Sequence, residues 1–215
     1  MDAPNISGFD CEFIQATQPS RHLVIVLHGL GDSLEGFLML PQVLALPGVN
    51  YLLLNAPFDY FMGFAWYDLE DPEPGILDSR ERLRGLMSEL TSQGWPSENL
   101  MLFGFSQGCL MSIDLGLRYD RPLAGIVGIS GYAAFLDRLE TEMHPQARKQ
   151  HWLITHGDQD ELLPLARSRS QMQQLQAAGV PVEWHEFNKG HTLDPEQELP
   201  LIREWIAGRF GITLG

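Results

Sequence analysis

One short stretch in the middle of the chain restricts the possible folds more than any other. The apolar run Leu-Met-Leu-Phe-Gly-Phe at 100–105 has the pattern of a buried strand, and an apolar helical pattern begins directly after Ser106. So sharp a turn from strand to helix leaves no room for side chains beside it, and Gly104 and Gly108 meet that requirement. The segment predicts a strand–turn–helix unit in which Ser106 is strained and its hydroxyl is lifted off the sheet.

The rest of the chain alternates short apolar runs with helical patterns. Buried strands are expected at 23–27, 50–55, 124–129, 152–155 and 182–187. Helices are expected at 33–46, 76–93, 165–178 and 199–210. This alternation predicts a mostly parallel central sheet with helices on both faces. No repeat or linker interrupts it, so a single domain over residues 1–215 is expected.

Two neighbouring segments do not follow this alternation. Residues 59–67 are rich in aromatic side chains but have no clear period. Residues 68–75 contain two prolines and four acidic residues, which predicts a loop.

Composition narrows the class of protein. A chain of 215 residues is long enough to bury roughly 70% of its unfolded surface. The formal net charge of −14 repels phosphate backbones, so nucleic acid is not an expected partner. The two cysteines, Cys11 and Cys109, make neither a disulfide framework nor a metal site, and no metal or cofactor is expected. No signal peptide or membrane span is visible, which favours a cytoplasmic protein without stable membrane insertion.

Three polar residues have the order of a nucleophilic site. A serine hydroxyl is a weak nucleophile, so it needs a base within hydrogen-bond reach and a carboxylate that orients the base. When the serine lies on a strand–helix turn of this kind, the chain order is Ser, acid, His. Ser106, Asp160 and His191 follow that order. Asp158 and Asp194 are the alternative acids, but Asp158 is explained by a turn and Asp194 as the cap of the last helix.

Backbone N–H groups can complete such a site. A tetrahedral intermediate carries a negatively charged oxygen that two N–H donors stabilise. Gln107, the first residue after the serine, can offer one donor, and Leu30, in the Gly-rich segment 28–31, can offer the other. His28 and His156, which also end strands beside glycine, are expected to be structural supports.

Taken together, the motifs resemble a known family. They are His28-Gly29-Leu30-Gly31-Asp32, Ala65-Trp66-Tyr67-Asp68, Gly104-Phe105-Ser106-Gln107-Gly108, His156-Gly157-Asp158-Gln159-Asp160 with Pro164, and Gly190-His191. As an ordered set from about residue 23 to the C-terminus, they resemble the phospholipase/carboxylesterase family of α/β-hydrolases, which includes acyl-protein thioesterases and small bacterial carboxylesterases.

The resemblance implies an α/β-hydrolase fold and assigns roles to five residues. It implies Ser106, Asp160 and His191 as a catalytic triad, with the N–H groups of Leu30 and Gln107 as the oxyanion hole. The chain departs from the family pattern in two places. A Cys-Leu pair at 109–110 replaces the small residues common after the serine turn, and the segment 69–76 looks short for the family.

The expected function is that of a serine hydrolase that cleaves carboxylic esters or thioesters through an acyl-enzyme intermediate. The expected substrate is a small acyl ester or acyl thioester, and an acylated protein stays open. A lysophospholipase and a non-catalytic binding module on a hydrolase fold are the alternatives, because a fold does not prove activity. A homodimer also stays open. The residues expected to bind the acyl group are Phe37, Leu38, Phe64, Trp66 and Leu163, with Phe58, Tyr60, Phe61 and Met62 as further candidates.

Overall fold

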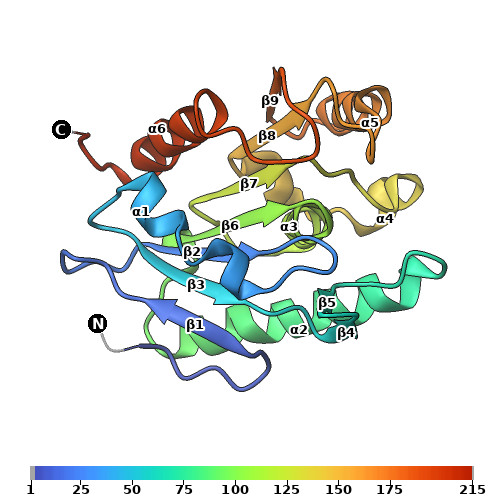
Figure 1. Cartoon of the computed structure of the whole chain (residues 1–215). Coiled ribbons are helices and arrows are strands. Elements are labelled where there is room, and N and C mark those ends of the chain that lie inside the picture. The colour runs from blue at the N-terminus through green and yellow to red at the C-terminus, as the bar shows by residue number, and fades with distance from the viewer. Residues whose placement is uncertain (1–2, 215) are drawn as a thin grey trace.

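A seven-stranded sheet forms the centre of the molecule. The computed structural model describes residues 3–214. In this part of the chain the strand order is β1-β3-β2-β6-β7-β8-β9, and β1 alone runs antiparallel to its neighbour (Figure 1). The strands are β1 (Cys11–Ile14), β2 (Leu23–Leu27), β3 (Asn50–Leu54), β6 (Leu100–Phe105), β7 (Gly125–Ile129), β8 (Trp152–Gly157) and β9 (Val182–Phe187). The predicted mostly parallel sheet is confirmed.

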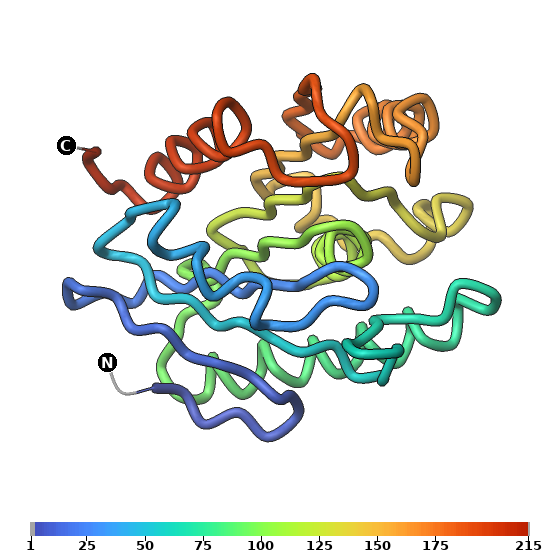
Figure 2. Tube along the Cα trace, viewed as in Figure 1, coloured from blue at the N-terminus to red at the C-terminus, as the bar shows by residue number. Residues whose placement is uncertain are grey.

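Helices pack on both faces of this sheet, as Figure 1 and the trace in Figure 2 show. They are α1 (Leu40–Leu44), α2 (Pro72–Ser92), α3 (Gln107–Arg118), α4 (Leu139–Glu142), α5 (Leu165–Ala177) and α6 (Glu198–Phe210). Side chains of β2 alternate between two apolar layers. Leu23 and Ile25 pack in the layer of α2, α3 and α5, whereas Val24 and Val26 pack in the layer of α1 and α6. The period-two alternation therefore gives each face of the sheet its own core.

The predicted loop at 68–75 is wrong in its second half, because α2 begins at Pro72. Both prolines, Pro72 and Pro74, lie in the first turn, where a missing N–H removes no helical hydrogen bond. Glu73 places a negative charge at the positive end of the helix and pairs with Arg138 at 2.8 Å. Proline is therefore compatible here with the start of a helix, which the sequence pattern alone does not distinguish from a loop.

The helix expected at 33–46 is also wrong in extent. The chain forms a 3₁₀ turn at Leu34–Phe37 and then the short helix α1. Pro41 lies in the first turn of α1, and proline cannot continue a helix that began earlier because it lacks an N–H and its ring clashes with the preceding turn. Ala45, with φ of 48°, then ends α1 in the left-handed conformation.

Three strands, the edge strand β1 and the two strands of a hairpin, were not predicted. The edge strand β1 has a mixed burial pattern, and residues 58–65 form an antiparallel hairpin of β4 (Phe58–Tyr60) and β5 (Gly63–Ala65). A bridge between Asp32 and Phe64 ties this hairpin to the loop after β2. The hairpin therefore lies beside the edge where β2, β6, β8 and β9 end, the position in which ligands bind to open parallel sheets.

Among the residues described, none forms a helix long and apolar enough to cross a membrane.

Candidate active site

Ser106 occupies a strained turn between β6 and α3. Its backbone has φ of 55° and ψ of −113°, a conformation that residues with side chains rarely adopt. A β-carbon at Gly104 would lie 2.1 Å from the carbonyl oxygen of Gly108, and one at Gly108 would lie 2.0 Å from the carbonyl oxygen of Leu27. The two glycines thus allow strand and helix to pack against each other, and the serine between them is partly exposed.

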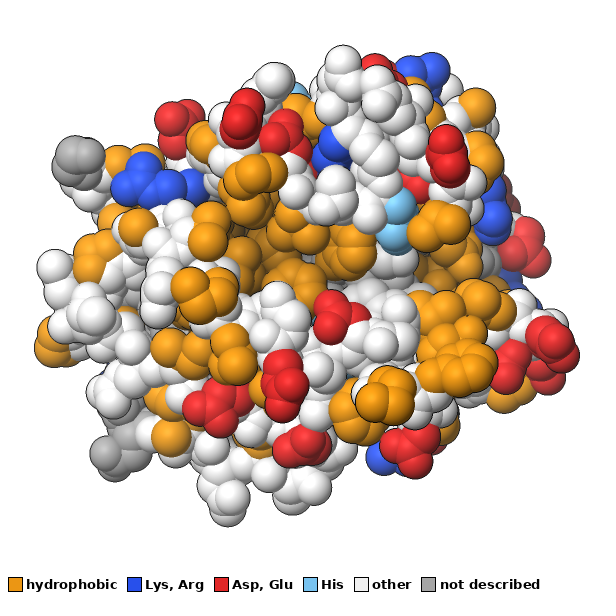
Figure 3. Space-filling view, viewed as in Figure 1, with side chains coloured by type: hydrophobic (Ala, Val, Ile, Leu, Met, Phe, Trp, Pro, Cys, Tyr) orange, Lys and Arg blue, Asp and Glu red, His pale blue; other side chains and the backbone are white. Residues whose placement is uncertain are grey.

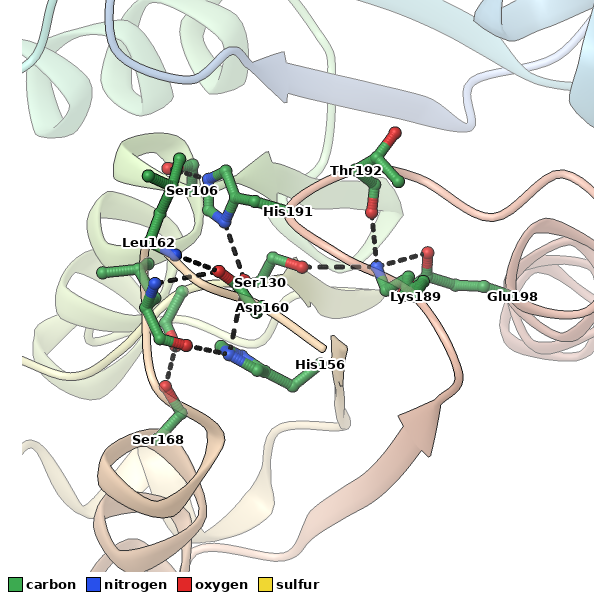
Figure 4. A network of polar contacts seen from close by, with 12 residues as sticks. Ser106, Ser130, His156, Asp160, Leu162, Ser168, Lys189, His191, Thr192 and Glu198 are labelled. Carbon is green, nitrogen blue, oxygen red and sulfur yellow. Dashed lines mark hydrogen bonds and ion pairs between the residues drawn. The ribbon is translucent and has the colours of Figure 1, made fainter. Parts of the chain in front are cut away.

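His191, in the loop after β9, connects Ser106 to Asp160. Its Nε2 is 2.9 Å from the Oγ of Ser106, and its Nδ1 is 2.7 Å from Oδ2 of Asp160 (Figure 4). The Phe105 ring packs against the imidazole, with 5.0 Å between the ring centroids. With its proton on Nδ1, the ring donates to the carboxylate and leaves Nε2 free to accept the serine proton. The structure therefore brings the three candidate residues into one hydrogen-bonded chain.

The carboxylate of Asp160 is buried and held on both oxygens. Oδ1 accepts the N–H groups of Leu162 at 3.0 Å and of Leu163 at 2.8 Å, while Oδ2 accepts from His191. Burial by itself raises the pKa of Asp160. The bonds from Leu163 and His191 outweigh burial, so the pKa lies below its ordinary value and the carboxylate stays ionised.

The two alternative acids lie outside this chain of hydrogen bonds. Asp158 is exposed. Asp194 accepts the N–H of Glu196 at 2.9 Å, and α6 begins only at Glu198, so Asp194 closes the turn before the helix and is not its cap. The prediction that Asp194 caps the last helix is wrong, because Pro195 and the residues after it form a turn first.

Two histidines support the site from below. His156 is fully buried and donates from Nε2 to the carbonyl oxygen of Leu163 at 2.8 Å, which braces the loop of Asp160. His28 donates from Nδ1 to the carbonyl oxygen of Gly29 at 2.6 Å and accepts the N–H of Ala56 at 3.0 Å. Burial lowers the pKa of both histidines, so they pack as neutral rings.

Leu30 and Gln107 both line the cavity that contains Ser106. The N–H of Gln107 heads α3, where the first N–H groups have no helical acceptor. In the described part of the chain the N–H of Leu30 has no acceptor either. The buried side chain of Gln107 accepts the N–H of Trp66 at 2.9 Å and donates to the carbonyl oxygen of Tyr67 at 3.0 Å. These bonds hold Gln107 in place at the start of α3, where its N–H is free to donate to a bound group.

The cavity beside Ser106 has a volume of about 570 Å³ and a mostly apolar wall. Figure 3 shows hydrophobic side chains gathered in a hollow on this face of the molecule. The apolar residues that line the cavity are Leu30, Tyr67, Leu69, Phe105, Tyr132, Leu162 and Leu163. A smaller hollow of about 330 Å³ adjoins it and shares Asp32, Phe105 and His191. Ser106 therefore lies in the wall of the larger, apolar cavity, whereas the smaller hollow reaches His191 and not the serine.

The structure brings some of the predicted acyl-binding residues to these hollows and not others. Leu163 lines the larger cavity, and Phe37 lines the smaller one, although most of its ring packs against Phe103 in the core. Trp66 does not reach the cavity because it is fully buried and its Nε1 donates to the backbone of His28.

The other predicted residues lie nearby but outside the cavity wall. Leu38 and Phe64 line neither hollow, and Phe64 packs near the ring of His28. Sequence reasoning missed Tyr67, Leu69, Tyr132 and Leu162. For Tyr67 a signal existed, because it is the neighbour of Trp66 in the Ala-Trp-Tyr-Asp motif.

Cys109 is fully buried behind the serine turn and packs in the core. Burial raises the pKa of its thiol to about 12, so the thiol is not a nucleophile at neutral pH. Among residues 3–214, no group of three or more His, Cys, Asp or Glu side chains has an arrangement that could hold a metal ion.

The chain is similar to known hydrolases in sequence and in fold. The chain matches the phospholipase/carboxylesterase family over residues 10–208 and belongs to that family of hydrolases. It is 29% identical over 203 residues to acyl-protein thioesterase 1 of Yarrowia lipolytica, covering 85% of this chain and 89% of that one. It is 31% identical over 166 residues to acyl-protein thioesterase 1 of Schizosaccharomyces pombe, covering 71% of this chain and 74% of that one.

Solved structures agree with the fold. The crystal structure of esterase PE8 is 26% identical, has a TM-score of 0.81 and covers 93% of this chain and 98% of its own. The crystal structure of SOBER1 from Arabidopsis thaliana is 23% identical, with a TM-score of 0.81 over 89% of this chain and all of its own, and supports the fold alone. The predicted family and the α/β-hydrolase fold are confirmed, and the comparisons support ester or thioester hydrolysis as its activity.

Proposed function

We propose that the protein hydrolyses carboxylic esters or thioesters by nucleophilic catalysis at Ser106. The observation that carries the proposal is the chain of hydrogen bonds from Ser106 through His191 to Asp160 at the wall of an apolar cavity. A strained serine, an imidazole and a buried carboxylate joined in this order are the groups that nucleophilic acyl transfer requires.

In the first half of the reaction, the Oγ of Ser106 attacks the acyl carbonyl carbon while Nε2 of His191 takes its proton. The N–H groups of Leu30 and Gln107 stabilise the resulting oxyanion. The carboxylate of Asp160 stabilises the imidazolium that forms. His191 then protonates the departing oxygen or sulfur, which leaves an ester of the acyl group with Ser106.

In the second half, water takes the place of the leaving group. His191 removes a proton from the water, which attacks the acyl-enzyme carbonyl and passes through the same oxyanion site. Collapse returns the proton to Ser106 and releases the carboxylic acid. Neither half of this reaction requires a metal ion or another cofactor.

The shape of the site supports an acyl chain as the group that enters the larger cavity. Its wall is mostly apolar, and its volume of about 570 Å³ falls in the range of pockets that enclose small organic ligands. Relatives named acyl-protein thioesterase make an acylated protein a candidate substrate alongside small acyl esters and thioesters. An opening ringed by exposed Leu69 and Leu162 is compatible with a bulky leaving group outside the cavity.

The test measures hydrolysis of nitrophenyl esters and acyl-CoA thioesters of graded chain length by the wild type and by Ser106→Ala. We expect a loss of about 10⁴-fold or more in kcat with an unchanged melting temperature, as in comparable triads. A fluorophosphonate probe should label the wild type and leave Ser106→Ala unlabelled. Hydrolysis within tenfold of the wild type by the folded variant would contradict the proposal.

A further inference from the structure

A buried ion pair lies behind the loop that carries His191. The ammonium group of Lys189 is 2.6 Å from Oε2 of Glu198, the first residue of α6 (Figure 4). The side chain of Lys189 is 3% exposed and that of Glu198 is 0% exposed. Burying two charges costs free energy that their attraction need not recover, and apolar residues of similar volume are often as stabilising. Stability alone therefore does not explain the pair.

Lys189 joins three separate segments at one point. Its Nζ donates to Glu198, to the carbonyl oxygen of Thr192 at 2.6 Å and to the Oγ of Ser130 at 3.3 Å (Figure 4). All three ammonium hydrogens thus have an acceptor. Ser130, which directly follows β7, has a φ of 51° and donates its N–H to the carbonyl oxygen of Thr155 at 2.9 Å. The lysine therefore connects the loop of His191 to the centre of the sheet.

Glu198 holds the same loop from the other side. Its Oε2 also accepts the N–H of Asp194 at 3.0 Å. His191 consequently lies between two residues joined to one ion pair, Lys189 two positions before it and Asp194 three positions after it. The carbonyl oxygen of Lys189 in turn accepts the N–H of Gln159 at 3.1 Å. This bond connects the loop of His191 to the loop that carries Asp160.

The choice of lysine matches this geometry. The chain contains only two lysines against twelve arginines, and the other lysine, Lys149, is exposed. An ammonium group can direct three donors to oxygens in different directions, whereas a guanidinium group is planar and larger. Burial lowers the pKa of Lys189, and the charge of Glu198 and its hydrogen bond oppose that change.

We propose that Lys189 and Glu198 are positioning residues that hold the imidazole of His191 within hydrogen-bond distance of the hydroxyl of Ser106. The inference rests on the proposed function, in which His191 must reach the serine hydroxyl. A displacement of about 1 Å in such a site can cost roughly 100-fold in rate. The pair acts through the loop and touches no substrate, so its loss should lower kcat and leave KM unchanged.

The experiment compares three variants with the wild type. Lys189→Met combined with Glu198→Leu replaces the ion pair by apolar side chains and leaves no buried charge unpaired. Glu198→Gln keeps an oxygen that can accept from both Lys189 and Asp194, so it is the conservative variant. Lys149→Met is the matched control, because it removes the other lysine. The measurements are kcat and KM on nitrophenyl butyrate, the melting temperature, the rate of fluorophosphonate labelling, and the low-field N–H proton signal of His191 in NMR.

We expect the double variant to fold with a kcat lowered roughly 10- to 100-fold, an unchanged KM, slower labelling and a shifted or broadened His191 signal. Glu198→Gln should keep kcat within about fivefold, and Lys149→Met should match the wild type. A folded double variant with the kcat and NMR signal of the wild type would overturn the proposal. So would a Glu198→Gln variant as impaired as the double variant. Failure of the proposed function is recognised separately, because the wild type would then show no Ser106-dependent hydrolysis.

Discussion

The floor and the rim of the cavity around Ser106 are built in opposite ways. The floor consists of Ser106, Asp160 and His191, and hydrogen bonds at 2.7–2.9 Å join these three side chains. The rim consists of Leu69 and Leu162, which are 59% and 72% exposed. The floor obtains one geometry from many short contacts, whereas the rim offers apolar surface with few constraints. Changes in the floor should therefore affect the chemical step, and changes in the rim should affect the choice of substrate.

Asp160→Asn should have the largest effect on the floor among changes that keep the nucleophile Ser106. The amide cannot stabilise an imidazolium and favours the wrong tautomer of His191, so we expect kcat to fall roughly 10³- to 10⁴-fold. Asp158→Asn is the matched control, because Asp158 lies two residues earlier and is exposed. Its kcat should stay within about threefold of the wild type. If Asp158→Asn is the more harmful change in steady-state assays, the carboxylate has been assigned wrongly.

Alanine substitution of glycines tests how closely the turn around Ser106, which supports the floor, is packed. Gly108→Ala would place a β-carbon 2.0 Å from the carbonyl oxygen of Leu27, so we expect a loss of stability of about 3 kcal/mol or more. Gly85 lies on the exposed face of α2, and an added β-carbon would have nothing within 4 Å. Gly85→Ala should therefore raise the free energy of unfolding by about 0.5–1 kcal/mol. Urea unfolding of both variants measures the difference. Equal stabilities would contradict the close packing of the serine turn.

The same contrast explains which parts of the molecule could be predicted. The serine turn was predictable because its constraint is local and steric, so Gly104 and Gly108 mark it in the sequence. The order Ser, acid, His along the chain restricted which residues could accompany Ser106 and favoured Asp160 and His191. The parallel sheet followed from the alternation of strands and helices. These features depend on backbone geometry that few residues satisfy.

The rim could not be predicted in the same way. Large apolar side chains occur both in cores and in cavities, so Trp66 and Tyr67 could not be told apart without the hairpin that orients them. The start of α2 was missed because Pro72 is compatible with a loop and with a first helical turn. The edge strand β1 was missed because it has only four residues and none of them is fully buried. Each of these outcomes depends on tertiary packing.

Truncating the rim should change specificity without stopping the reaction. Leu69→Ala and Leu162→Ala each remove apolar surface at the cavity mouth. For a substrate that contacts the leucine, each change should cost about 1 kcal/mol of binding free energy. We expect kcat/KM for octanoyl esters to fall about fivefold, while the value for acetyl esters stays within twofold. The readout is the ratio of the two constants on nitrophenyl esters. An equal loss on both substrates would place these leucines in the chemical step and erase the distinction between floor and rim.

The smallest expected effect is a pH dependence of stability from His156, which supports the loop of Asp160 beneath the floor. Burial lowers the pKa of His156 beneath the loop of Asp160 from its ordinary value of 6.5. Below about pH 6.5 the unfolded chain therefore binds a proton that the folded chain does not, so stability is full above that pH and falls as the pH decreases. The slope cannot exceed about 1.4 kcal/mol per pH unit for each such proton.

Urea unfolding between pH 7.5 and 5.5 should show this fall in the wild type and in Leu69→Ala, which removes no titrating group. His156→Gln should show a shallower fall, because its amide can still donate to Leu163 but takes up no proton. A slope in His156→Gln equal to that of the wild type would assign the acid sensitivity to other buried histidines, such as His28, whose pKa burial also lowers.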